Sequence, residues 1–264
     1  MANLISQTFK NKSKKIVTFV TGGDPDFETS DEIIKILIKN NIDLIEIGMP
    51  FSDPMADGPT IQLSSNRALK NGINLNDIFK LVSNAKNTNG KLPVILMGYY
   101  NVIFHYGIKE FVKKCVTNGV DGLIIVDLQP EEDKDLINEL KINNIDLIRL
   151  ITPTTNEERL KLILENASGF LYYVSVMGTT GQKSANVNEL EKSINFIKKY
   201  TELPIIPGFG IKSPIDVKNI CKIADGAVVG SSIIKIIEEN INNKKFMIKK
   251  IEEFTKNLKD GTLI

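Results

Sequence analysis

The stretch DLIEIGMPFSDPMADGPT, Asp43 to Thr60, joins an apolar run of strand length to a proline-rich loop. Similar runs recur along the chain with amphipathic segments between them. The runs are KIVTFV (15–20), DLIEIG (43–48), LPVILMG (92–98), DGLIIVD (121–127), IDLIRLI (145–151), FLYYVSV (170–176), LPIIPG (203–208) and DGAVVG (225–230). Nearly continuous hydrophobicity, rather than strict alternation, is typical of parallel strands that helices cover.

The segments between the runs place apolar residues three and four positions apart, which predicts amphipathic helices. Asn or Gly ends several of them, as at 40–41, 118–119 and 143–144. We expect one extra helix at 60–70, before the helix near 75–88, and another at 243–258. Strand and helix alternating eight times predict a (β/α)8 TIM barrel with extra helices, with a doubly wound open sheet as the main alternative. Because no linker or composition shift divides the 264 residues, we expect a single domain spanning 1–264.

The charge balance argues against nucleic acid or an anionic membrane as a partner. Lys and Arg number 33 against 32 Asp and Glu, so the net charge is only +1. The two cysteines, Cys115 and Cys221, have no metal-ligand spacing, which indicates a reducing compartment. The N-terminal segment lacks the order of a secretory signal, and no run approaches the roughly 20 apolar residues of a membrane span. We therefore expect a cytoplasmic protein, or one of a similar compartment such as the plastid stroma.

Acidic residues cluster where a barrel of this kind places its working groups, at the carboxyl end of a strand. Glu46 ends an apolar strand, and burial there would raise its pKa towards neutrality, which suits proton transfer. A glutamate that turns to solvent or pairs with a base is an equally open alternative. Asp53 and Asp57 follow in a loop restrained by prolines, and each alone fits a turn. Together with Glu46, however, they permit one acid to move protons while another stabilises positive charge.

Two glycine-rich motifs suggest a phosphate site. PGFGIKSP (207–214) and VVGSSI (229–234) follow the seventh and eighth strands, where barrel enzymes often bind phosphate. Gly208, Gly210 and Gly230 let backbone N–H groups approach an anion. Gly230 and Ser231 also begin a helix whose N-terminus attracts negative charge.

A third loop, VMGTTGQKSAN (176–186), is longer than the other connections after strands and fits a lid over the substrate. Thr180 and Gly181 in this loop would contribute to the anion site or close over it. Tyr172, in the strand before it, either presents its hydroxyl to the mouth of the barrel or is a core residue. The single histidine, His105, has neither a nucleophile pattern nor a second metal ligand nearby, so we interpret it as structural.

The motifs taken together resemble a known family. IEIGMPFSDPMADGPTIQ resembles the signature of the tryptophan synthase alpha chain family, and FVTGGDP, GYYNVIF, YYVSVMGTTG, GFGIKSP and GSSIIKIIE follow in the family's order. The resemblance covers essentially the whole chain. It implies a (β/α)8 barrel and a lyase that performs retro-aldol cleavage of indole-3-glycerol phosphate to indole and glyceraldehyde 3-phosphate.

The resemblance also implies roles for individual residues. Glu46 would be the principal acid and base, Asp57 would stabilise the indolenine through its ring nitrogen, and Tyr172 matches the family's active-site tyrosine. The residues matching positions around the substrate are Phe19, Tyr99, Ile124 and Phe209 for the indole ring, and Thr180, Gly181, Gly210, Gly230 and Ser231 for the phosphate and lid.

The family resemblance further implies a partner. A pyridoxal-phosphate beta chain would receive indole through a tunnel within an α2β2 assembly, so this chain itself would need no cofactor and no metal. The loop around Asp53 would face that partner. Two departures from the usual pattern, Gln129 and Thr179, concern partner contact and lid behaviour, respectively.

Two other kinds of protein are alternatives. One is a different phosphate-binding barrel, such as an isomerase or aldolase; a Schiff-base aldolase needs a lysine inside the barrel, and none of the eight runs offers a convincing one. The other is a catalytically silent barrel that activates a beta chain, which the presence of both Glu46 and Asp57 disfavours. An assay for indole formation, with and without beta chain, separates these possibilities.

Overall fold

The strands of the computed structural model form one parallel sheet, in the order β5-β4-β3-β2-β1-β9-β8-β7-β6. The structure describes residues 3–11, 13–132, 134–174, 183–208 and 210–262, and the side chains of 183–186 lie outside this description. The strands are β1 Lys15–Thr21, β2 Leu44–Gly48, β3 Val94–Gly98, β4 Gly122–Ile125, β5 Asp146–Leu147, β6 Arg149–Ile151, β7 Leu171–Val174, β8 Ile205–Gly208 and β9 Gly226–Val229.

The short strands β5 and β6 close the sheet into a barrel. Only Ile148 separates them in the sequence, yet β5 pairs with β4 and β6 pairs with β7. They are therefore two halves of the strand predicted at 145–151. The (β/α)8 barrel is confirmed, and the open doubly wound sheet is excluded.

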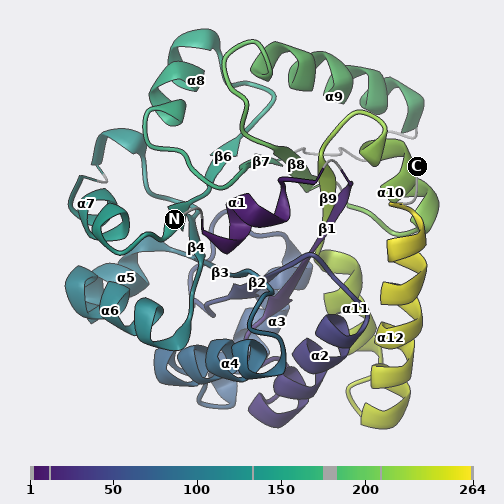
Figure 1. Cartoon of the computed structure of the whole chain (residues 1–264). Coiled ribbons are helices and arrows are strands. Elements are labelled where there is room, and N and C mark those ends of the chain that lie inside the picture. Colours follow the sequence, from purple (N-terminus) through teal and green to yellow (C-terminus); the bar gives the residue numbers. More distant parts are fainter. Residues whose placement is uncertain (1–2, 12, 133, 175–182, 209, 263–264) are drawn as a thin grey trace.

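Helices surround this ring of strands, except that the first helix lies across the centre of the ring (Figure 1). They are α1 Leu4–Thr8, α2 Phe27–Lys39, α3 Pro59–Lys70, α4 Leu75–Thr88, α5 Tyr100–Tyr106, α6 Ile108–Asn118, α7 Lys134–Ile142, α8 Glu157–Leu164, α9 Lys183–Ile197, α10 Pro214–Cys221, α11 Ser231–Glu239 and α12 Lys244–Asp260, with a 3-10 turn η1 at Pro130–Glu132. The predicted helices at 60–70, 75–88 and 243–258 are confirmed as α3, α4 and α12.

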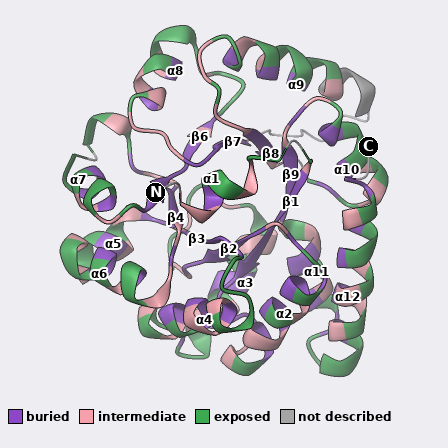
Figure 2. Cartoon of the chain, in the orientation of Figure 1, coloured by how far each residue is buried: buried purple, intermediate pink, exposed green. Residues whose placement is uncertain are grey.

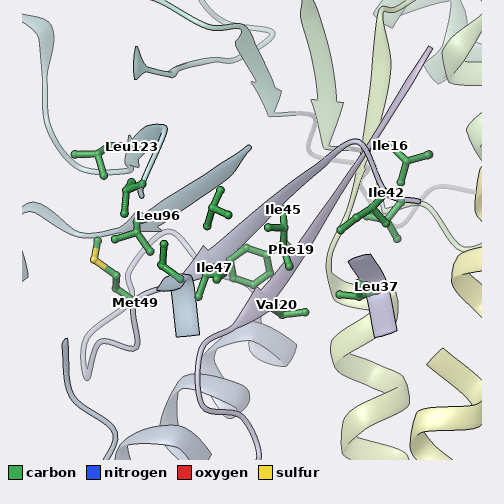
Figure 3. Close-up of a cluster of buried hydrophobic side chains, with 14 of the residues drawn as sticks. Ile16, Phe19, Val20, Leu37, Ile42, Ile45, Ile47, Met49, Leu96 and Leu123 are labelled. Carbon is green, nitrogen blue, oxygen red and sulfur yellow. The ribbon is translucent and has the colours of Figure 1, made fainter. Parts of the chain in front are cut away.

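Two apolar layers share the side chains of the strands, because successive residues of a strand point to opposite faces. The outer layer lies between strands and helices and includes Ile16, Ile45 and Ile47 with Leu37 of α2 (Figure 3). The buried faces of strands and helices meet there (Figure 2). The inner layer fills the barrel and consists of Ile5, Val17, Leu44, Ile95, Ile124, Ile148, Phe170, Ile206 and Val228. Since Leu44 belongs to the inner layer, Glu46, two residues further along β2, also points into the barrel.

Candidate active site

Glu46 is a carboxyl group enclosed by the barrel. It pairs in register with Phe19 of β1 and Ile95 of β3, and its exposed fraction is 0%. Neither carboxylate oxygen has a hydrogen-bond partner among the described residues. Burial raises the pKa of Glu46 to about 8. The group is therefore mostly protonated at neutral pH and can act as a proton donor.

Asp57 lies in the loop between β2 and α3, and a tyrosine beneath the loop holds it in place. The Tyr99 hydroxyl accepts a hydrogen bond from the Ala56 N–H at 3.1 Å and donates one to the Asp57 carboxylate. The side chain of Gln62 donates to the Asp57 carbonyl at 2.8 Å. Burial raises the pKa of Asp57, and the Tyr99 hydroxyl opposes this rise because it binds the ionised form.

Tyr172 interacts electrostatically with both acids, Glu46 and Asp57. It lies on β7 and packs against the inner apolar layer. Burial raises the pKa of Tyr172 well above its ordinary value, and the charges of Glu46 and Asp57 raise it further. The phenol therefore stays protonated and can donate a hydrogen bond inside the barrel.

A cavity of about 670 Å³ connects these groups with the glycine-rich motifs. Its wall includes Phe19, Asp57, Tyr172, Gly210, Gly230 and Ser231. Glu46 has no exposed surface and lies behind this wall. The cavity is in the size range of small-ligand sites, and it presents an acidic end and a glycine-rich end to one ligand.

The glycine-rich end is shaped by close contacts and one hydrogen bond. A Cβ atom added at Gly208 would lie 2.4 Å from the Tyr172 hydroxyl oxygen, so only glycine lets that hydroxyl approach. Gly210 has a φ of +56°, a conformation that favours glycine. Gly230 is the N-cap of α11. Ser232 is the second residue of that helix, and its hydroxyl donates to the Ile211 carbonyl at 2.5 Å. This bond fastens the loop after β8 to the N-terminus of α11.

Not every predicted site residue reaches the cavity wall. Tyr99 is only 2% exposed and supports the acidic loop from below, and Ile124 is fully buried in the inner layer. Thr179, Thr180, Gly181 and Phe209 lie outside the described residues, so the predicted lid is untested.

The cavity also has a polar lobe that the sequence reasoning did not assign. Gln129, Thr152 and Arg159 line it, and the Arg159 guanidinium donates to the side chains of Gln129 and Glu131. Thr152 directly follows the closing strand β6, so its position at a strand end was the available signal. Gln129, noted above as a departure from the family pattern, is thus a wall residue whose side chain is fixed from α8.

The described residues lack the features of two other kinds of site. No group of three or more His, Cys, Asp and Glu there could hold a metal ion. His105 lies exposed on α5. Within the same residues, no helix combines the length and hydropathy needed to cross a membrane.

Comparisons with known proteins agree closely with this geometry. The family model described as "Tryptophan synthase alpha chain" matches residues 5–263. The tryptophan synthase alpha chain of Petrotoga mobilis is 48% identical over 97% of this chain and 98% of its own, and that of Zymomonas mobilis is 42% identical over 98% and 94%.

Solved structures give the same result. The alpha subunit of tryptophan synthase from Legionella pneumophila superposes with a TM-score of 0.92 at 34% identity, covering 99% of both chains. A chain of M. tuberculosis tryptophan synthase in an aminoacrylate-bound form superposes with a TM-score of 0.88 at 26% identity, covering 99% of this chain and 100% of its own.

Proposed function

This chain belongs to the tryptophan synthase alpha chain family, and from that premise we propose that Glu46, Asp57 and Tyr172 carry out the family's reaction inside the barrel. The reaction is a lyase reaction, the retro-aldol cleavage of indole-3-glycerol phosphate to indole and glyceraldehyde 3-phosphate. The observation that carries the assignment is the enclosed carboxyl of Glu46, whose pKa of about 8 keeps its proton available at neutral pH.

The first step is protonation of the indole ring. Glu46 gives its proton to C3 of the indole, which leaves positive charge on the ring nitrogen. The carboxylate of Asp57 stabilises this charge through a hydrogen bond from the ring N–H. Tyr99 supports the ionised state of Asp57 by donating to it. Because Glu46 lies behind the cavity wall, its side chain has to turn towards the cavity when substrate binds.

The second step breaks the carbon–carbon bond. Glu46, now ionised, takes the proton of the glycerol hydroxyl next to the ring, and the electron pair of the C–C bond returns to the indole. The products are indole and an aldehyde, glyceraldehyde 3-phosphate, and Glu46 recovers its proton. The Tyr172 hydroxyl donates a hydrogen bond to the substrate within the same space. General acid–base steps of this kind contribute about 10²- to 10⁴-fold each.

The phosphate is assigned to the glycine-rich end of the cavity. Backbone N–H groups around Gly210, Gly230 and Ser231 would bind it, with the N-terminus of α11 supplying favourable partial charge. Phe19 would contact the indole ring from the cavity wall, and Tyr99 and Ile124 would shape that pocket from behind it. We assign Thr180, Gly181 and Phe209 to the lid and the ring pocket on family resemblance alone. In this proposal one domain, 1–264, performs the chemistry without a metal or cofactor.

The family implies a beta-chain partner. We propose an α2β2 assembly in the cytoplasm, or in a plastid stroma, in which the pyridoxal phosphate belongs to the beta chain and indole passes to it. The acidic loop, which joins β2 to α3 and carries Asp53 and Asp57, offers a surface for this partner. Met55 in the loop is 81% exposed, and Phe104 on the neighbouring helix α5 is 67% exposed. Large exposed apolar side chains near a functional loop are typical of interaction sites.

The test is indole release from indole-3-glycerol phosphate by the full chain, alone and with beta chain. We expect Glu46→Gln and Asp57→Asn each to abolish release in a folded protein. Asp146→Asn is the matched control, because Asp146 is also a buried carboxyl with a raised pKa but lies at the start of β5, at the opposite end of the barrel. Substantial release by folded Glu46→Gln would remove Glu46 from the mechanism. If neither the wild type nor any variant releases indole, the result would favour a catalytically silent barrel.

A further inference from the structure

A polar seam joins α3 to the loop that follows β1. Ser64, Arg67 and Asn71 lie three and four positions apart, and so share one face of the helix. Each bonds a different residue, either the last residue of β1 or one in the loop that follows it. The hydroxyls of Thr21 and Ser64 are 2.5 Å apart and fully enclosed, and the Asn71 amide donates to the Pro25 carbonyl at 2.5 Å.

The central contact of the seam is a buried ion pair. Arg67 Nε and Nη2 donate to the two carboxylate oxygens of Asp24 at 2.7 and 2.9 Å. Asp24 is only 1% exposed, and the same guanidinium lies 3.9 Å from Glu238 of α11. A bidentate ion pair of this kind fixes the relative orientation of the two side chains as well as the distance between them. The ion pair therefore fixes both the rotation and the position of α3.

The position of α3 matters because Asp57 directly precedes it. Gly58 is the N-cap of α3, and Gln62 in the first turn donates to the Asp57 carbonyl at 2.8 Å. The loop residues Met55 and Ala56 are exposed, so the packing of the loop itself offers little support. Tyr99 holds the side-chain end of Asp57, and α3 holds its backbone end.

We propose that Arg67 is a positioning residue for Asp57: by pairing with Asp24 it holds α3, and with it the Asp57 backbone, at the distance that the ring nitrogen requires. The inference rests on the role proposed above for Asp57. Displacing a reacting group by about 1 Å from a remote site can cost on the order of 100-fold in rate. Arg67 itself does not touch the substrate.

The test compares Arg67→Met with Lys86→Met. Lys86 forms a similarly enclosed pair with Asp121 at 2.9 Å, but at the start of β4, at the opposite end of the barrel. We expect Arg67→Met to lower the kcat for indole release about 10- to 100-fold, whereas Lys86→Met leaves it within about twofold. Arg67→Lys, which keeps the charge and one hydrogen bond, should recover part of the loss. Equal losses in both Met variants would overturn the proposal.

Two ligands separate a role at Asp57 from a general loosening of the site. Indole-3-propanol phosphate presents a ring N–H to Asp57, whereas glycerol 3-phosphate presents only the phosphate end. In Arg67→Met we expect weaker binding of the first and unchanged binding of the second, both measured by calorimetry. Equal weakening of both would overturn the proposal.

A double variant distinguishes failure of this inference from failure of the proposed function. Asp57→Asn alone tests the role of Asp57. In the Asp57→Asn background, Arg67→Met should weaken indole-3-propanol phosphate binding no further. An undiminished effect there would show that Arg67 acts elsewhere. If Arg67→Met does not fold, Asn71→Ala, which removes only the exposed end of the seam, should give a smaller loss with the same ligand pattern; no such loss would contradict the proposal.

Discussion

At the scale of single residues, Glu46 links stability to pH. Its pKa is about 8 in the folded chain against an ordinary value of 4.5. Between these values the folded state keeps a proton that the unfolded chain has released. The free energy of unfolding therefore falls by about 1.4 kcal/mol per pH unit as pH rises from 4.5 to 8, and the effect is constant above 8.

Glu46→Gln should remove this dependence. The glutamine does not titrate. Between pH 4.5 and pH 7, the free energy of unfolding of the variant should therefore rise by about 3 kcal/mol relative to that of the wild type. Urea unfolding at pH 4.5, 7 and 8.5 measures the difference, and comparing slopes cancels the constant cost of burying the amide. Parallel stability curves for the two proteins would mean that Glu46 ionises freely in the folded state.

Sequence reasoning singled out Glu46 and Asp57 as candidates but could not orient all of their neighbours. The apolar residues on both sides of Glu46 remove the alternation that tells the inner face from the outer one. Resemblance places Tyr99 around the indole ring, yet its hydroxyl lies under the acidic loop, between Ala56 and Asp57. That contact depends on how a loop folds over a neighbouring strand, which periodicity does not encode.

At the scale of elements, short-range signals predicted the long helices and missed the short ones. The stops at Asn40-Asn41, Asn118-Gly119 and Asn143-Asn144 are confirmed, with Asn41, Gly119 and Asn144 at positive φ. By contrast, α1 and α5 are too short, at five and seven residues, to show a helical period. The break between β5 and β6 at Ile148 is equally invisible, because the run IDLIRLI (145–151) contains no Gly or Pro to mark it.

The end of β8 is sensitive to the addition of a single methyl group. Gly208→Ala would place a Cβ 2.4 Å from the Tyr172 hydroxyl oxygen, so the Tyr172 side chain has to shift. Overpacking of this kind costs about 1–3 kcal/mol, and we expect Tyr172 to be displaced with at least a tenfold loss of indole release. Steady-state kinetics beside thermal unfolding measures both effects. Gly90→Ala is the control, because its Cβ would meet only an ordinary contact at 3.6 Å; an equal effect there would contradict the steric explanation.

At the scale of the whole molecule, α1 completes the barrel from below. Asn3 caps this helix and its side chain also bonds Asp146 of β5. Ile5 is fully buried in the inner layer, whose other members come from strands around the ring, and a Cβ at Gly122 would lie 2.8 Å from its Cδ1 atom. Helix α1 lies across the ring of strands (Figure 1), and its Ile5 side chain fills one end of the interior that holds Glu46.

Ile5→Ala tests how far the barrel depends on this helix. The substitution leaves a cavity that strands held in a closed ring cannot collapse to fill, so we expect a loss of about 2–5 kcal/mol in the free energy of unfolding. The cavity also admits water nearer to Glu46, which lowers its pKa and moves the alkaline limit of indole release to lower pH. Urea unfolding and the pH profile of kcat/KM measure the two effects. Ile142→Ala, on an exposed side chain, should change neither. A destabilised Ile5→Ala protein with an unshifted pH profile would show that the apolar surroundings of Glu46 are set by the strands alone.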